Sequence, residues 1–200
     1  MMYSKGKVAG ILFIAAATQF VLGLTISEAL YPDYSISDNY ISDLGVGSSS
    51  IIFNSSVFLL GLLLIIGIFY LRHISNFRIV NILLLLMALG AMGVGVFTEE
   101  YRVAHGAVAF IAFLCAGLSA LASYKALQKP FSIISIILGA ISLGALFLYS
   151  AGFITSGSLT SNIVYDSNFY LGLGPGGMER MIIYPTLMWI TGLGGHLVTQ

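Results

Sequence analysis

Three side chains that commonly exchange protons or bind metals lie where apolar segments of the chain begin or end. Asp43 lies in a polar loop, His105 opens one apolar segment, and Glu179 directly precedes another. Carboxyl groups and an imidazole that share a pocket can act as acid, base or metal ligands. Asp43, His105 and Glu179 are therefore the candidate catalytic residues, and the sequence leaves open whether a metal binds.

Other charged residues near these positions are candidates for binding a substrate. Glu28 ends the first apolar segment, where a helix dipole and nearby hydrocarbon both disfavour a carboxylate, so we expect it to form an ion pair or a hydrogen bond. Its expected partners are Arg102, Arg180 or His105, and either arginine could instead hold an anionic headgroup. The candidate binding residues are Arg180, Arg102, Glu28, Glu99 and Glu100.

Helix starts offer a simpler explanation for part of this set. Thr98 has the residue type of a helix N-cap, and Glu99 and Glu100 would then lie in the first turn, where the helix dipole favours carboxylates. Glu179 is expected in the first turn of a later helix for the same reason. A cap does not explain His105, which could be a packing residue, a proton carrier or a metal ligand.

Common catalytic and cofactor-binding signatures are absent from the sequence. There is no nucleophile elbow, P-loop or dinucleotide-binding fingerprint. His73 and His196 are expected on the opposite side of a membrane from His105, which argues against a zinc site built from several histidines. A lone Cys115 excludes an internal disulfide. We expect no bound cofactor.

The composition places these residues in a membrane protein. Of the 200 residues, 58% are hydrophobic and only 8% are charged, with a mean hydropathy of +0.98. Soluble domains contain about 25% charged residues, so the composition excludes a soluble globular fold, and it equally excludes disorder. The net charge of zero, without a basic run, argues against a nucleic-acid partner.

Six apolar stretches approach the roughly 20 residues that a membrane-crossing helix needs. None has the alternating pattern of a barrel strand. We therefore predict an all-α protein with a single transmembrane domain over residues 1–200. Small residues four apart, such as Ala91 and Gly95 or Thr191 and Gly195, predict where the helices touch. The predicted spans are residues 8–27, 51–71, 79–97, 105–124, 131–153 and 181–198.

The distribution of charge predicts the orientation. Six of the eight Lys and Arg residues lie on one side of the predicted spans, which places both termini in the cytoplasm. Two long loops, residues 29–50 and 154–177, then face outward. Every acidic residue is expected on this outer side: Glu28, Asp33, Asp38, Asp43, Glu99, Glu100, Asp166 and Glu179.

Four sequence segments resemble the prokaryotic "domain of unknown function 998" membrane family. They are Asn-Tyr-Ile-Ser-Asp-Leu-Gly-Val-Gly at 39–47, Ile-Phe-Asn-Ser-Ser at 52–56, Glu99–Gly106, and Gly-Met-Glu-Arg-Met-Ile-Ile-Tyr-Pro at 177–185 with a following Trp189. The resemblance covers essentially the whole chain. It implies no established activity, and it suggests that Asp43, His105, Glu179 and Arg180 belong to one shared feature. We expect a multi-pass protein of the plasma membrane.

Three classes of function fit these observations. The small size and lack of catalytic signatures favour an accessory or structural subunit that binds other membrane-protein subunits. The acidic outer side and aromatic loops favour a protein or enzyme that binds a lipid or another amphiphile. A small transporter or channel is the third, although Gln19 is the only strongly polar side chain expected at mid-depth. Membrane lipids are expected partners in every case.

Overall fold

The structure is a computed structural model that describes residues 5–72, 77–155 and 167–199, and its long elements are six helices. All six are long and apolar enough to cross a membrane. This confirms the predicted all-α bundle. His73 and Asp166 lie outside the described residues. The helices are α1 (Lys5–Leu30), α2 (Ser50–Leu71), α3 (Arg78–Val96), α4 (Arg102–Ala122), α5 (Phe131–Thr155) and α6 (Gly174–Val198).

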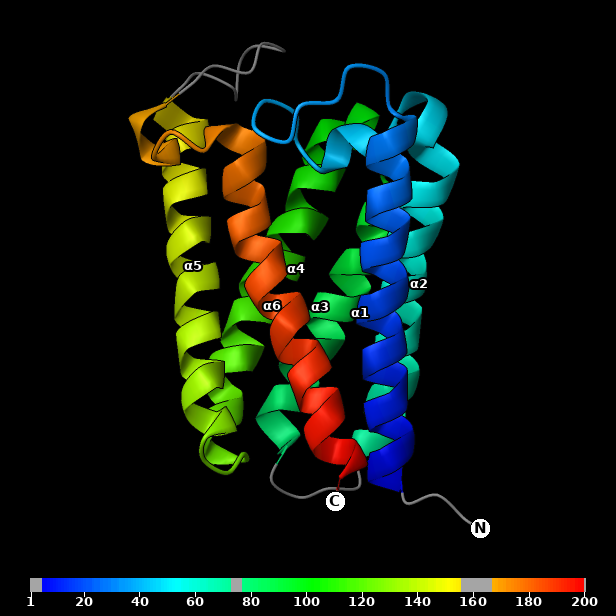
Figure 1. The fold of residues 1–200 in the computed structure, drawn as a ribbon, viewed down its shortest axis with the longest axis vertical. Helices are drawn as coiled ribbons and strands as arrows, with labels where there is room; N and C mark the ends of the chain where they lie inside the picture. The colour runs from blue at the N-terminus through cyan, green and yellow to red at the C-terminus, as the bar shows by residue number, and fades with distance from the viewer. Residues whose placement is uncertain (1–4, 73–76, 156–166, 200) are drawn as a thin grey trace.

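The six helices form a closed ring, shown in Figure 1. Each packs against its neighbours along the chain, and α6 returns to pack against α1. Both chain termini lie at the same end of the ring, termed here the terminal end (Figure 1). The opposite end is termed the acidic end, because all the acidic residues in the described part of the chain lie there: Glu28, Asp33, Asp38, Asp43, Glu99, Glu100 and Glu179.

The ring closes at a seam where α1 and α6 approach through glycines. A Cβ atom on Gly10 would lie 2.5 Å from the Gly194 carbonyl oxygen, and one on Gly194 would lie 2.7 Å from that of Gly10. The predicted contact through Thr191 and Gly195 is wrong. Thr191 is exposed and a Cβ on Gly195 would meet nothing within 4 Å. The seam includes Gly194 because the buried face of α6 carries this residue and its apolar neighbours.

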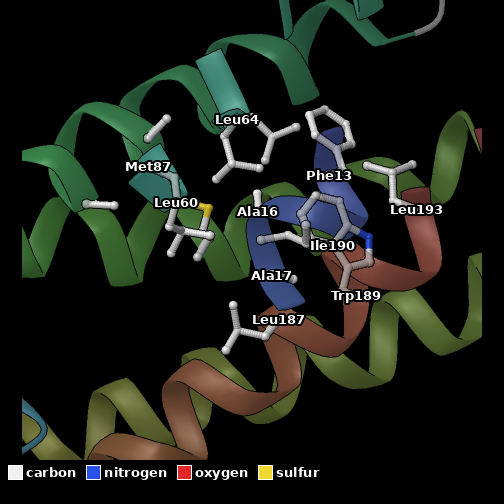
Figure 2. Close-up of a cluster of buried hydrophobic side chains, with 14 of the residues drawn as sticks. Phe13, Ala16, Ala17, Leu60, Leu64, Met87, Leu187, Trp189, Ile190 and Leu193 are labelled. Carbon is white, nitrogen blue, oxygen red and sulfur yellow. The ribbon is translucent and has the colours of Figure 1, made fainter. Parts of the chain in front are cut away.

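Apolar side chains fill the terminal half of the ring. Phe13, Leu64, Trp189 and Leu193 are fully buried and belong to one cluster, part of which Figure 2 shows. The Trp189 indole N–H donates to the Ser123 hydroxyl at 3.1 Å, which satisfies its one polar atom. Ser123 belongs to the short 3-10 turn η5 (Ser123–Lys125) after α4, so this hydrogen bond also links α6 to that turn.

Two helix starts differ from the prediction. Helix α6 begins at Gly174, seven residues before the predicted 181, because Pro175 lies in its first turn, where a missing N–H costs nothing. Glu179 is therefore past the first turn. Helix α4 begins at Arg102 after the 3-10 turn η4 (Glu99–Tyr101), and the Thr98 side chain does not cap it.

Candidate functional site

Arg180 holds the loop between α1 and α2 over the acidic end. Its Nη2 lies 2.5 Å from Glu28 Oε1 and donates to Tyr34 Oη at 2.8 Å. Its Nη1 donates to the carbonyl oxygens of Ile36 and Gly176, each at 3.1 Å. The prediction that Glu28 forms an ion pair is thereby confirmed, and of the three expected partners Arg180 is the one that pairs with it. Because these contacts engage both Nη atoms, Arg180 is placed to position the loop.

Tyr34 extends this network into the loop. Its hydroxyl donates to the Tyr40 carbonyl oxygen at 3.2 Å while accepting from Arg180. Burial raises the pKa of Tyr34 to about 12, although the hydrogen bond from Arg180 acts in the opposite direction. The hydroxyl therefore remains protonated at neutral pH and can serve as donor and acceptor at once.

Two carboxylates fix the part of the loop that lies next to α6. Glu179 is 5% exposed, and its Oε2 accepts the backbone N–H of Ile41 at 2.6 Å. Asp43 lies in the 3-10 turn η1 (Ser42–Gly45), and its Oδ2 accepts from Asn39 Nδ2 and from the Tyr40 backbone N–H, each at 3.0 Å. The loop segment 39–43 is thus held from both sides by charge-assisted hydrogen bonds.

His105 has a defined tautomer. Its Nδ1 lies 2.7 Å from the carbonyl oxygen of Phe97, at the end of α3. Because a carbonyl oxygen only accepts, Nδ1 must carry the hydrogen, and in the neutral ring Nε2 then carries the lone pair. The side chain is half-buried at the edge of a cavity. The Nε2 atom could accept a proton or a hydrogen bond from a bound molecule.

A cavity of about 870 Å³ at the acidic end brings six of the candidate residues together. It lies among η4, the first half of α4, the last half of α5, the start of α6 and the loop after α1. Glu28 and Arg180 do not line it. The carboxyl, imidazole and guanidinium side chains that do are Asp43, Glu99, Glu100, Arg102, His105 and Glu179.

Aromatic rings form one wall of this cavity. The Tyr149 ring contacts those of Tyr40, Phe153 and Tyr170, with centroids 6.0, 6.4 and 6.4 Å apart. Tyr40, Tyr149 and Phe153 line the cavity, and Tyr170 lies behind them. Sequence reasoning missed this wall. The four-residue spacing of Tyr149 and Phe153, which places both on one face of a helix, was the available signal.

A second, apolar cavity of about 70 Å³ adjoins the first along the axis of the ring. The two share Ser42, His105, Ala109, Phe113 and Glu179 as lining residues. The second cavity continues between α1, α2, α3, α4 and α6 toward the buried cluster of Figure 2. Ser42, His105 and Glu179 therefore lie where the large polar cavity meets the small apolar one.

The cavity residues do not form a metal centre in the described part of the chain. No group of three or more His, Cys, Asp or Glu side chains there is arranged to hold a metal ion. Glu99 and Asp43 nevertheless lie within hydrogen-bonding reach of each other. Two carboxyl groups this close can share a proton or together bind a positively charged group.

The closed ring of apolar helices, with charged groups gathered in a cavity at one end, defines a multi-pass membrane protein. The family model described as "Protein of unknown function (DUF998)" matches residues 14–196, and the chain belongs to this family. The resemblance found in the four sequence segments is thus confirmed. Neither the curated proteins nor the solved structures contain a match.

Proposed function

We propose that the protein binds an amphiphilic molecule in the cavity at the acidic end. The observation that carries the proposal is the cavity itself, which combines charged side chains, an aromatic wall and an adjoining apolar space. Ligand sites are typically concave and mostly apolar, with a few polar groups that fix the orientation. The polar head would contact Asp43, Glu99, Glu100, Arg102, His105 and Glu179.

The packing of α4 against α5 supports access from the membrane. In the terminal half the two backbones approach closely, since a Cβ on Gly139 would lie 2.9 Å from the Gly117 carbonyl oxygen. In the acidic half the cavity lies between them. Phe110 of α4 lines this cavity and is 49% exposed, and Phe147 of α5 is 72% exposed nearby. A membrane-dissolved molecule could enter between these helices.

The orientation in the membrane is part of the proposal. We place the acidic end outside the cell and both termini in the cytoplasm of a plasma-membrane protein. Support comes from the terminal end, where the described residues include six cations and no acids. The ligand would then come from the outer leaflet.

The other two function classes have less support. For transport, a polar pathway past Gln19 would be needed, but its amide donates to the carbonyl oxygens of Ala16 and Ser56 and lines neither cavity. For an accessory subunit, the membrane-facing surface would have to bind a second protein. The cavity favours amphiphile binding over both.

A single glycine allows a direct test. Gly106 lines the cavity, and a Cβ placed on it would meet nothing within 4 Å. Gly106→Trp should therefore fill the cavity without disturbing the helix contacts. Gly144 of α5 offers equal open space but does not line the cavity, so Gly144→Trp is the matched control.

The measurement is native mass spectrometry of the full chain purified gently from its own membranes. We expect a discrete small-molecule mass on the wild type and on Gly144→Trp, and its loss from Gly106→Trp. A wild-type chain without that mass, or equal retention by both variants, would overturn the proposal. A stoichiometric protein partner in place of the small molecule would establish the accessory role instead.

A further inference from the structure

We propose that the ligand of this cavity is a cationic amphiphile, with its ammonium headgroup between the carboxyl groups and the aromatic wall. This inference rests on the proposed function and names the chemical class of the ligand. Two features of the cavity support a positive charge on the ligand, its carboxyl groups and its ring faces, and a buried hydroxyl supports a polar group beside that charge.

Carboxyl groups outnumber basic side chains in the lining of the cavity. Asp43, Glu99, Glu100 and Glu179 line the cavity, against Arg102 as its one arginine. Arg180, the other arginine at this end, is engaged with Glu28 and does not line it. Ionised carboxyl groups around one space repel one another, and a bound cation relieves that repulsion. An anionic headgroup would add to it.

The aromatic wall supplies a second attraction for a cation. Tyr149 stands at the centre of the wall, between Tyr40 and Phe153. Tyr and Phe ring faces attract ammonium groups within about 6 Å of the ring centroid, most strongly where water is excluded. Carboxyl groups and ring faces together form the kind of site that recognises alkylated ammonium ions.

The hydroxyl of Tyr40 is a third feature. Tyr40 is 6% exposed and lines the cavity, and its hydroxyl lies beside that of Tyr170. Within the described residues this hydroxyl has no carbonyl or carboxylate acceptor. A buried hydroxyl of this kind costs free energy unless it finds a partner, so a hydroxyl or carbonyl oxygen of the ligand would stabilise it.

The test compares three single-chain probes that share one hydrocarbon tail: hexadecyltrimethylammonium, hexadecanol and hexadecyl sulfate. Radiolabelled hexadecyltrimethylammonium is bound to the full chain in nanodiscs of a neutral glycolipid that carries no ammonium group, with binding to empty nanodiscs subtracted, and the other two compete. We expect the cation to bind at least about tenfold more tightly than either competitor. Equal competition by the alcohol or the sulfate would overturn the inference.

Matched variants test whether the carboxyl groups of the lining cause the preference for the cation. Glu99→Gln and Glu100→Gln should each weaken binding of the cation about tenfold, since each removes one carboxyl group that could pair with the cation. Asp33→Asn removes a carboxyl group from an exposed loop position whose positive φ of 55° suits asparagine, and binding should not change. An equal loss in Asp33→Asn would show that surface potential alone attracts the probe and would overturn the inference.

Two further variants test the aromatic wall, and Gly106→Trp separates this inference from the proposed function. Tyr149→Leu should weaken cation binding, whereas Tyr149→Phe keeps the ring and should restore it. If the three probes bind with equal affinity and Gly106→Trp blocks all of them, the cavity binds amphiphiles but the charge preference is wrong. If Gly106→Trp blocks none of the probes, the proposed function itself fails.

Discussion

At the scale of single residues, the candidate residues at the acidic end fall into two sets, which differ in whether they line the cavity. Glu28 and Arg180 secure the loop and do not line the cavity, whereas the other six do: Asp43, Glu99, Glu100, Arg102, His105 and Glu179. Of these six, Asp43 and Glu179 also hold loop segment 39–43. Sequence alone showed that Glu28 needed a partner, because neither the helix dipole nor hydrocarbon stabilises a carboxylate there. It could not choose among the three partners, since that choice depends on how the loop folds back.

The ion pair should contribute strongly to stability. Arg180→Met leaves the Glu28 carboxylate without its partner in a site where Arg180 is 5% exposed, so we expect a loss of about 3–5 kcal/mol in the free energy of unfolding. Reversible unfolding in mixed micelles would measure it. Combining Arg180→Met with Glu28→Gln should recover part of the loss.

The matched control is Lys129→Met, which removes a cation from an exposed position at the terminal end. It should change the free energy of unfolding by no more than about 0.5 kcal/mol. A comparable loss in both variants, or no recovery in the double variant, would contradict a specific role for the pair.

At the scale of helices, composition was sufficient to predict six spans but not their contacts. Hydropathy reports which residues avoid water, and in lipid both the exposed and the packed faces of a helix are apolar. The contact of the last helix was therefore predicted one residue away from its place, at Gly195 instead of Gly194, and its partner helix was not predicted. The start of α6 was missed for a related reason, because Gly-Pro-Gly-Gly has the composition of a loop although Pro175 fits a first helical turn.

The seam between α1 and α6 gives a prediction at this scale. Gly194→Leu would force a side chain against the Gly10 carbonyl oxygen and Ile14, and should destabilise the protein by at least about 1–3 kcal/mol. Trp189 lies on the same helix and is the only tryptophan, so its fluorescence should report the loosened packing.

Gly195→Leu is the control, because the same side chain enters open space there. Its stability and its Trp189 emission should match the wild type. Equal effects of the two substitutions would show that the seam does not run through Gly194.

At the scale of the whole molecule, charge is separated between the two ends of the ring. The cavity could not be predicted from the sequence, because it forms where the loop, α4, α5 and α6 meet. The spacing of Tyr149 and Phe153 indicates only that the two rings share a helix face, not what that face contacts. The side of the membrane that each end faces, by contrast, is predicted from the positions of the cations and can be measured directly.

Single cysteines should establish the orientation. In a Cys115→Ala background, Ser48→Cys places a thiol at an exposed position of the acidic end and Lys125→Cys places one at the terminal end. A membrane-impermeant maleimide added to intact cells should label the first, and the second only after permeabilisation. The reverse pattern would place the acidic end in the cytoplasm.

The closure of α6 onto α1 also sets an order of events during synthesis. Arg180 lies 152 residues after Glu28, so a ribosome that adds about 5–20 residues per second produces the arginine roughly 8–30 s after the glutamate. Throughout that interval the first helix carries an acid without its partner at the edge of the bilayer. The last helix therefore supplies the ion-pair partner of the first. A nascent chain that ends before Arg180 leaves the Glu28 carboxylate unpaired, and this distinguishes an unfinished molecule from a finished one.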